Sequence, residues 1–341
     1  MKRLSVLLSI LVAILFVSSL VISCPTPKPE KPVVLRFAES ISPEKMPIIV
    51  EPMVERFNQR AGGKYVIELH FFAELVSLPE MVNAVETGAI EMAGFPLPLF
   101  AGLDTRFGVS EVPFLFNNIR ASHDSLEAFL PIYSGILEKN FNQKVLALSC
   151  VAAIDPVSAE IPIKELEDWD GLLVQSISPP TAAVIEALGG APVPIPFAEA
   201  YMSMQKGVVD ATIQSSVDFV LPYKLYEVAH YITLCNLMLP HTAMTINLDT
   251  WNSLPKDIQD ILVEEFLRLG EEKSQDSIKN ADEVERLLTE RGMEVYRLPE
   301  VERDRWREVL HPYIEQSIAD LGELGQKAVQ AAEEANSKFP Y

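Results

Sequence analysis

The sequence predicts an α/β fold with two lobes, each built from a sheet flanked by helices. Strand and helix patterns alternate from residue 33 to beyond residue 240, which is typical of largely parallel sheets. A unit of helix, glycine and strand also occurs once in each half of the chain. The 341 residues are enough for one large domain or two lobes of ordinary size after removal of an N-terminal leader.

The first 23 residues predict a signal peptide. Lys2 and Arg3 give a positive start, residues 4–20 are almost continuously apolar, and Ser23 precedes Cys24 as in a bacterial lipobox. We therefore expect the mature chain to begin at a lipid-modified Cys24. An uncleaved anchor helix is the alternative, but the apolar run is short for a full membrane span.

Residues 24–32 predict a tether that lifts the folded protein off a membrane. Four of these residues are proline, at positions 25, 27, 29 and 32, so this stretch cannot form a helix. The predicted location is the periplasm or the cell surface, with a lipid anchor in a bacterial membrane.

The charge of the chain excludes nucleic acids as partners. The formal net charge is −20, and loss of Lys2 and Arg3 with the leader makes it −22. No basic stripe offsets this repulsion of phosphate groups. Cys150 and Cys235 lie in apolar segments and are expected to be small buried residues, with a disulfide between them as the alternative.

The first elements are a strand over residues 33–39, a helix over 47–60 and a strand over 65–72. The repeated unit then follows. A short helix begins at Pro79 and ends at Gly88, before a strand over 89–95. Its counterpart is a helix over 197–206 that ends at Gly207, before a strand over 208–214.

The repeat puts Phe95 and Gln214 at equivalent positions, near the carboxyl ends of strands, where open α/β sheets bind ligands. The alternative is that any helix–strand unit shows this pattern, because glycine is the residue that most often ends a helix.

Residues 173–190 predict a strand followed by a helix. Ser178 suits the N-cap, Pro179 the first helical position and Gly189 the stop. The free N–H groups at the start of this helix would attract polar or anionic ligand groups beyond Gln175.

Residues 253–291 carry a broad apolar face that is typical of a long helix. If continuous, this helix is long enough to span more than one lobe. Two helices broken at Gly270 are the alternative.

Read together, these elements resemble the substrate-binding receptors of tripartite ATP-independent periplasmic (TRAP) transporters, the DctP family. The similar stretches follow the family's order and cover most of the mature chain. They are residues 86–92, 112–116, 161–172, 187–193, 199–201 with 207–210, and 247–255.

The resemblance implies two α/β lobes, joined by crossing strands and a long helix, that close on a ligand in the cleft between them. The receptor would deliver this ligand to a separate TRAP permease in the membrane. By analogy, one lobe comprises residues 33–155 and 242–282, and the other comprises residues 156–241 and 283–341.

Two positions depart from the family pattern, one at Gln175 and one in residues 150–156, where members often carry a second arginine and this chain has none. Members usually carry an arginine that binds the ligand's carboxylate where this chain has Gln175, and no arginine occurs between Arg120 and Arg268. An arginine forms two charge-assisted bonds with a carboxylate, whereas a glutamine offers only neutral groups. We therefore expect a ligand that is less acidic and more apolar than the usual C4-dicarboxylate, unless Lys144, Lys206, Lys224 or the helix start near Ser178 supplies donors.

The resemblance and the strand ends together give six candidate ligand-binding residues. Each could instead be a core residue or a polar residue at a strand end. They are Gln175, Gln214, Phe197, Phe95, Glu39 and Phe219.

An enzyme is the competing class. The five histidines show no metal-ligand spacing and no serine lies in a nucleophile elbow, so we expect no metal, no cofactor and no catalytic residue. A hydrolase that uses Asp155, Glu160 or Asp210 as acid and base stays open, as does a scaffolding or sensory lipoprotein with this fold.

Overall fold

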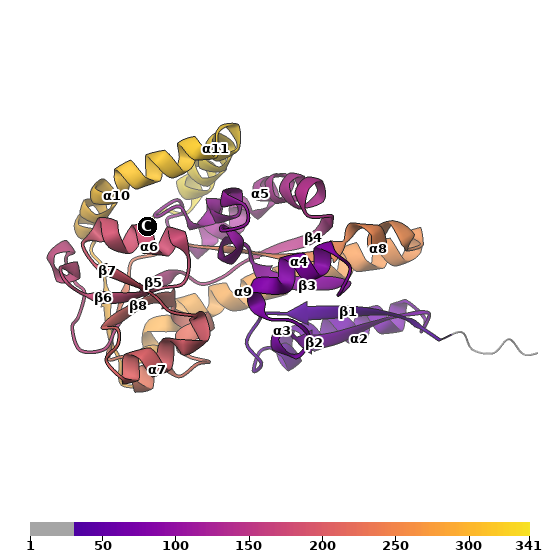
Figure 1. Ribbon diagram of the computed structural model, residues 1–341, viewed down its shortest axis with the longest axis horizontal. Helices are drawn as coiled ribbons and strands as arrows, with labels where there is room; N and C mark the ends of the chain where they lie inside the picture. Colours follow the sequence, from indigo (N-terminus) through magenta and orange to yellow (C-terminus); the bar gives the residue numbers. More distant parts are fainter. Residues whose placement is uncertain (1–30) are drawn as a thin grey trace, which may run out of the picture.

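Two separate sheets divide the computed structural model, which describes residues 31–341, into two lobes (Figure 1). The first sheet has the strand order β2-β1-β3-β10-β4. Its strands are β1 (Val33–Glu39), β2 (Tyr65–Phe71), β3 (Met92–Pro96), β4 (Gln143–Cys150) and β10 (His241–Asn247). The predicted two-lobed α/β fold is confirmed.

The second sheet has the order β11-β9-β5-β8-β6-β7. Its strands are β5 (Ile154–Ser158), β6 (Leu173–Ser176), β7 (Ala191–Pro194), β8 (Ala211–Ser215), β9 (Tyr231–Leu234) and β11 (Glu294–Arg297). Phe95 in β3 and Gln214 in β8 are each the next-to-last residue of their strand, so the predicted equivalence of their positions is confirmed.

Both sheets are mixed, whereas the sequence predicted largely parallel ones. Of the nine strand pairings among the described residues, five are parallel and four are antiparallel. Every antiparallel pairing involves β5 or β10. These two strands lie next to the points where the chain passes from one sheet to the other, and each therefore runs against its neighbours.

Helices cover both sheets (Figure 1). They are α2 (Glu51–Arg60), α3 (Phe72–Leu75), α4 (Met81–Glu86), α5 (Ile119–Asn140), α6 (Pro179–Leu188), α7 (Ala200–Gln205), α8 (Leu248–Ser253), α9 (Lys256–Thr289), α10 (Glu300–Asp320) and α11 (Glu323–Lys338). The start of α6 agrees with the sequence, because the Thr181 N–H donates to Ser178 Oγ at 3.2 Å. Its end agrees as well, since Gly189 has a φ of +102°.

Helix α9 is continuous over 34 residues, so the alternative of two helices broken at Gly270 is wrong. It packs against β4 of the first sheet and β11 of the second, and thus joins the lobes. A Cβ atom on Gly270 would lie only 2.4 Å from the backbone oxygen of Leu148. The glycine therefore permits close packing of the helix on β4 and does not end the helix.

The predicted lobe boundaries stay a prediction, and two features of the structure bear on them. The boundary after residue 155 falls inside β5, which belongs wholly to the second sheet. Helix α11, predicted in the second lobe, packs against α5, and Asn336 Nδ2 donates to the backbone oxygen of Leu115 at 2.9 Å. The C-terminal helix therefore contacts elements predicted to belong to the first lobe.

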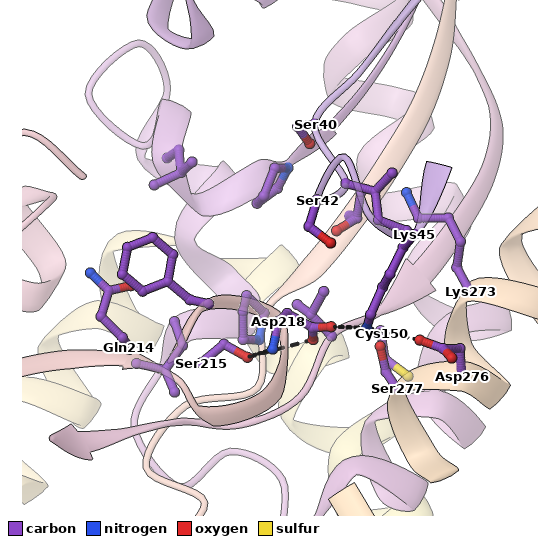
Figure 2. Close-up of a pocket in the computed structure, with 18 of the residues that line it drawn as sticks. Ser40, Ser42, Lys45, Cys150, Gln214, Ser215, Asp218, Lys273, Asp276 and Ser277 are labelled. Atoms are coloured by element: carbon purple, nitrogen blue, oxygen red, sulfur yellow. Dashed lines mark hydrogen bonds and ion pairs between the residues drawn. The ribbon is translucent and has the colours of Figure 1, made fainter. Parts of the chain in front are cut away.

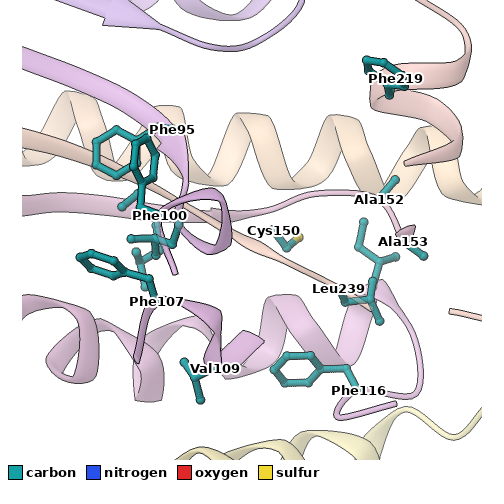
Figure 3. Packing of buried hydrophobic residues seen from close by; sticks show 14 of the residues in the cluster. Phe95, Phe100, Phe107, Val109, Phe116, Cys150, Ala152, Ala153, Phe219 and Leu239 are labelled. Atoms are coloured by element: carbon teal, nitrogen blue, oxygen red, sulfur yellow. The ribbon is translucent and has the colours of Figure 1, made fainter. Parts of the chain in front are cut away.

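One apolar cluster extends from the first lobe to the second (Figure 3). It contains Phe95 and Phe100, whose ring centroids are 4.9 Å apart, and it reaches Phe219. Cys150 belongs to this cluster; it and Cys235 are buried and free, which confirms the prediction of small buried residues. No helix within residues 31–341 is long and apolar enough to cross a membrane.

Candidate ligand-binding site

A cavity of about 140 Å³ is lined by residues at the ends of strands from both sheets (Figure 2). Its lining comes from both sheets and from α9. The lining residues are Ser40, Ile41, Ser42, Lys45, Pro96, Leu99, Glu111, Cys150, Val151, Ile154, Ile177, Gln214, Ser215, Asp218, Phe219, Pro240, Thr242, Lys273, Asp276 and Ser277. A cavity of this size matches a ligand of about the size of benzene.

Carboxyl ends of strands supply much of this lining. Ser40 follows β1 directly, Pro96 is the last residue of β3, and Gln214 and Ser215 end β8. The site therefore lies at the edge where α/β sheets bind ligands.

Lys45 is held between two carboxylates inside the cavity. It is the N-cap residue that precedes η1 (Met46–Val50). Its Nζ lies 2.8 Å from Asp218 Oδ1 and 2.8 Å from Asp276 Oδ2. Burial opposes the charge on the lysine, but the two carboxylates outweigh this effect and raise the pKa of Lys45. Asp218 also accepts the Ala152 N–H at 2.9 Å, so the ion pair joins residues far apart in the chain.

Lys273 on α9 forms the second ion pair. Its Nζ donates to both carboxylate oxygens of Glu39, at 3.0 and 3.1 Å, and both side chains are buried. Glu39 also accepts the N–H groups of Ser40 and Ile41, at 2.9 and 3.1 Å. A Cβ on Gly94 would lie 2.4 Å from Glu39 Oε2, so the glycine makes room for this carboxylate.

These contacts leave the site without a free positive charge among its described residues. Among the described residues, its two lysines are paired with Asp218, Asp276 and Glu39, and no arginine lines the cavity. A bound anion would have to displace one of these carboxylates or stay unpaired.

Glu111 is the remaining acidic residue of the lining. It ends η4 (Thr105–Glu111), its side chain is buried, and its Oε2 has no hydrogen-bond partner in the described part of the protein. Burial raises the pKa of Glu111 to about 8. The side chain is therefore mostly a neutral acid at pH 7.

The raised pKa of Glu111 predicts a pH-dependent stability. An unfolded glutamate titrates near pH 4.3, so folding takes up a proton between that pH and about 8, and stability falls as the pH rises, by up to about 1.4 kcal/mol per unit. Burial lowers the pKa of His241 to about 3, which has the opposite effect below about pH 6.5. Urea unfolding between about pH 6.5 and 8 should therefore show falling stability, and Glu111→Gln should flatten this slope. An unchanged slope in that variant, as expected for a variant of the exposed Glu127, would contradict the assignment.

Two of the predicted ligand-binding residues line the cavity. Gln214 is buried, and its Nε2 has no partner in the described part of the chain. Phe219 belongs to η7 (Ser216–Val220) and stacks on Tyr223 with ring centroids 4.6 Å apart. These two residues give the cavity one polar and one apolar wall.

Glu39 and Phe95 do not line the cavity. Glu39 is the partner of Lys273, and Phe95 packs into the apolar cluster beside Phe100. Phe197 begins η6 (Phe197–Glu199), but its side chain is not among those that the structure describes. Cys24 lies outside the described residues altogether.

Gln175 does not line the cavity. Its Nε2 donates to the backbone oxygens of Ile195 and Pro196, at 3.2 and 3.1 Å, and its Oε1 accepts the Thr212 hydroxyl at 2.8 Å. The side chain connects the segment after β7 to β8, so its polar groups are already used within the protein.

The other predicted sources of donors also differ from the structure. The first two positions of α6 are Pro179 and Pro180, which have no N–H, and the Thr181 N–H is taken by Ser178. The helix start therefore offers little to an anion. Lys144, Lys206 and Lys224 do not line the cavity either.

Sequence reasoning missed Ser42, Lys45, Glu111 and Lys273. Ser42 and Lys45 lie within six residues of the end of β1, where the rule of strand ends could have found them. Lys273 continues the spacing of Phe266 and Leu269 on the apolar face of α9, and a lysine at such a position signals a buried partner. Glu111 stands in an apolar segment, which is a weaker signal of the same kind.

The carboxylates considered for hydrolysis do not meet in the cavity. Asp155 is buried and accepts the N–H groups of Cys235 and Asn236, both at 2.9 Å, whereas Asp210 accepts the Leu173 N–H at 2.9 Å. Neither they nor Glu160 line the site. Within residues 31–341 no group of histidine, cysteine and acidic side chains could hold a metal ion.

Similarity to known proteins agrees with this architecture. The family model "Bacterial extracellular solute-binding protein, family 7" (DctP) matches residues 40–320. The C4-dicarboxylate-binding periplasmic protein DctP of Rhodobacter capsulatus is 25% identical over 336 residues, which are 95% of this chain and 98% of the relative. The 2,3-diketo-L-gulonate-binding periplasmic protein YiaO of Escherichia coli is 24% identical, over 76% of this chain and 80% of the relative.

A solved structure shows the same fold. The extracytoplasmic solute receptor of Bordetella pertussis that binds pyroglutamic acid superposes with a TM-score of 0.81 at 16% identity, covering 88% of this chain and 99% of that protein. The matched family consists of solute-binding receptors and not of enzymes. The chain therefore belongs to the DctP family of bacterial extracellular solute-binding proteins, the periplasmic receptors of TRAP transporters.

Proposed function

We propose that this receptor binds a small solute without net negative charge in the interlobe cavity and delivers it to a TRAP permease. The observation that carries the proposal is the charge balance of the site. Lys45 and Lys273 are already paired with three carboxylates, and no arginine within residues 31–341 lines the cavity. A buried carboxylate without a partner costs several kcal/mol, more than a hydrogen bond from a neutral group returns.

The names of the relatives refer to acids, so the pairing of Lys45 and Lys273 within the protein is more informative. The Rhodobacter relative is named for C4-dicarboxylates and the Bordetella receptor for pyroglutamic acid. For this chain to bind such an acid, Lys45 or Lys273 would have to exchange a carboxylate of the protein for that of the ligand. The apolar part of the lining, with Ile41, Leu99 and Phe219, favours the less acidic and more apolar ligand.

Calorimetric titration with succinate and with its uncharged diamide, succinamide, tests this proposal. The two compounds match in chain length and differ in charge. We expect succinamide to bind at least about tenfold more tightly than succinate, since a preference of that size needs only about 1.4 kcal/mol. Tighter binding of succinate would contradict the proposal, and a scaffold that has lost transport function would bind neither compound.

We also propose that the receptor is a lipoprotein anchored through Cys24, on the strength of the lipobox pattern and the proline-rich stretch after it. Cys24→Ala should prevent lipid attachment, so the protein should leave the detergent phase or keep its leader. Mass spectrometry and phase partition of the two forms measure this. An unchanged mass and an unchanged partition would count against the anchor.

A further inference from the structure

Three residues that line the cavity each carry a buried polar atom with no hydrogen-bond partner in the described part of the protein. The atoms are Ser42 Oγ, Glu111 Oε2 and Gln214 Nε2, and their residues are 6%, 3% and 2% exposed. Buried polar groups are nearly always paired, and an unpaired one costs about 1–3 kcal/mol. Three such atoms at one cavity indicate that a ligand pairs with them.

These residues reach the cavity from three separate elements. Ser42 comes from the segment after β1, Glu111 from the end of η4 and Gln214 from the end of β8. Figure 2 shows Ser42 and Gln214 on different sides of the space that Lys45 and Asp218 also border. Because Lys45 and Asp218 are held by their ion pair, the three unpaired atoms remain for a ligand.

The chemistry of the three groups defines what they can recognise. The amide nitrogen of Gln214 only donates, so it requires an acceptor oxygen on the ligand. The carboxyl group of Glu111 can accept a hydrogen bond from a ligand N–H or O–H in either protonation state, and the Ser42 hydroxyl can donate or accept. A ligand that satisfies all three therefore carries a donor and an acceptor.

We propose that Ser42, Glu111 and Gln214 determine specificity, and that they select a small amide or lactam, in which one carbonyl oxygen faces Gln214 and one N–H faces Glu111. This inference rests on the proposed function, which requires a ligand without net negative charge. The inference adds to that function the ligand class and the residues that recognise the ligand.

Titration with 2-pyrrolidinone and cyclopentanone tests the proposal, because these rings are similar in size and both have a carbonyl, but only the lactam has an N–H. The wild-type protein should bind 2-pyrrolidinone about tenfold more tightly than cyclopentanone, the difference expected for one buried hydrogen bond. Gln214→Leu should weaken the binding of both rings about tenfold. Glu111→Met should weaken only the lactam and bring the two affinities close together. Gln205→Leu, at an exposed glutamine, is the matched control.

Thermal unfolding of the ligand-free variants gives an independent readout. Gln214→Leu and Glu111→Met each remove an unpaired buried polar atom, so both should melt at the wild-type temperature or above it. A purely structural role would instead lower the melting temperature.

The proposal is overturned if the wild-type protein binds neither ring, or if the Gln214 and Glu111 variants bind both rings as the wild-type protein does. Titration with pyroglutamate, which adds a carboxylate to the lactam, separates this outcome from failure of the proposed function. Tighter binding of pyroglutamate than of 2-pyrrolidinone would contradict the uncharged ligand. Loss of that binding in Gln214→Leu would still support the role of Gln214.

Discussion

Replacement of Lys273 by methionine is expected to lower the free energy of unfolding by about 3–5 kcal/mol, the usual cost of leaving a buried charge without its partner. The lysine Nζ lies within 3.1 Å of both carboxylate oxygens of Glu39, and both side chains are almost fully buried. Methionine keeps most of the side-chain volume but offers no charge. Urea unfolding at pH 7 measures the loss.

Two further variants separate the ion pair from simple packing. The double variant Glu39→Gln/Lys273→Met should recover most of the lost stability, because no buried charge is left unpaired. Lys279→Met, at an exposed lysine of the same helix, should change stability little. A Lys273→Met protein as stable as the wild type would show that the Glu39 carboxylate does not depend on the lysine.

Replacement of Gly270 by alanine is expected to cost about 3 kcal/mol, at the upper end of the usual range for overpacking. The new Cβ would lie 2.4 Å from the backbone oxygen of Leu148 and 3.3 Å from the Ala147 Cβ. Because a backbone atom cannot move aside by rotation, α9 would have to shift away from β4. Urea unfolding measures the loss of stability, and a loss of ligand affinity would show that the shift reaches Lys273.

Gly135→Ala is the matched control for this substitution. Gly135 also lies inside a helix, α5, but a Cβ added there would meet nothing within 4 Å. It should leave stability unchanged or raise it by about 1 kcal/mol, the ordinary preference of helices for alanine. Equal effects at the two glycines would contradict the role of Gly270 in the packing of α9.

Two elements with local signals could be predicted from the sequence to the residue. The strand over residues 33–39 and the helix that Ser178 caps and Gly189 ends have the predicted bounds, because alternation and capping depend on neighbouring residues. The role of Gly270 could not be predicted from neighbouring residues. A glycine can end a helix or permit close packing, and only the position of β4 decides between these two roles.

The candidate site depended more on contacts between distant residues. The rule of strand ends placed Gln214 at the cavity, since its position in β8 is a local property. Gln175 follows the same kind of pattern, but its amide is bound by Thr212 and by the segment after β7, which no local pattern reveals. The pairing of Lys45 with Asp218 joins positions 173 residues apart. The pair changes the charge that the site offers to a ligand, and neither residue alone reveals this change.

Native mass spectrometry of receptor purified from its bacterium without refolding tests the central claim, that the ligand has no net negative charge, most directly. Ion pairs occupy both lysines of the cavity, whose volume of about 140 Å³ limits the ligand to a small molecule. The released ligand should therefore be a small molecule without a carboxylate. A bound dicarboxylate or sugar acid would contradict the account, because it would show that Lys45 or Lys273 exchanges its partner for the ligand.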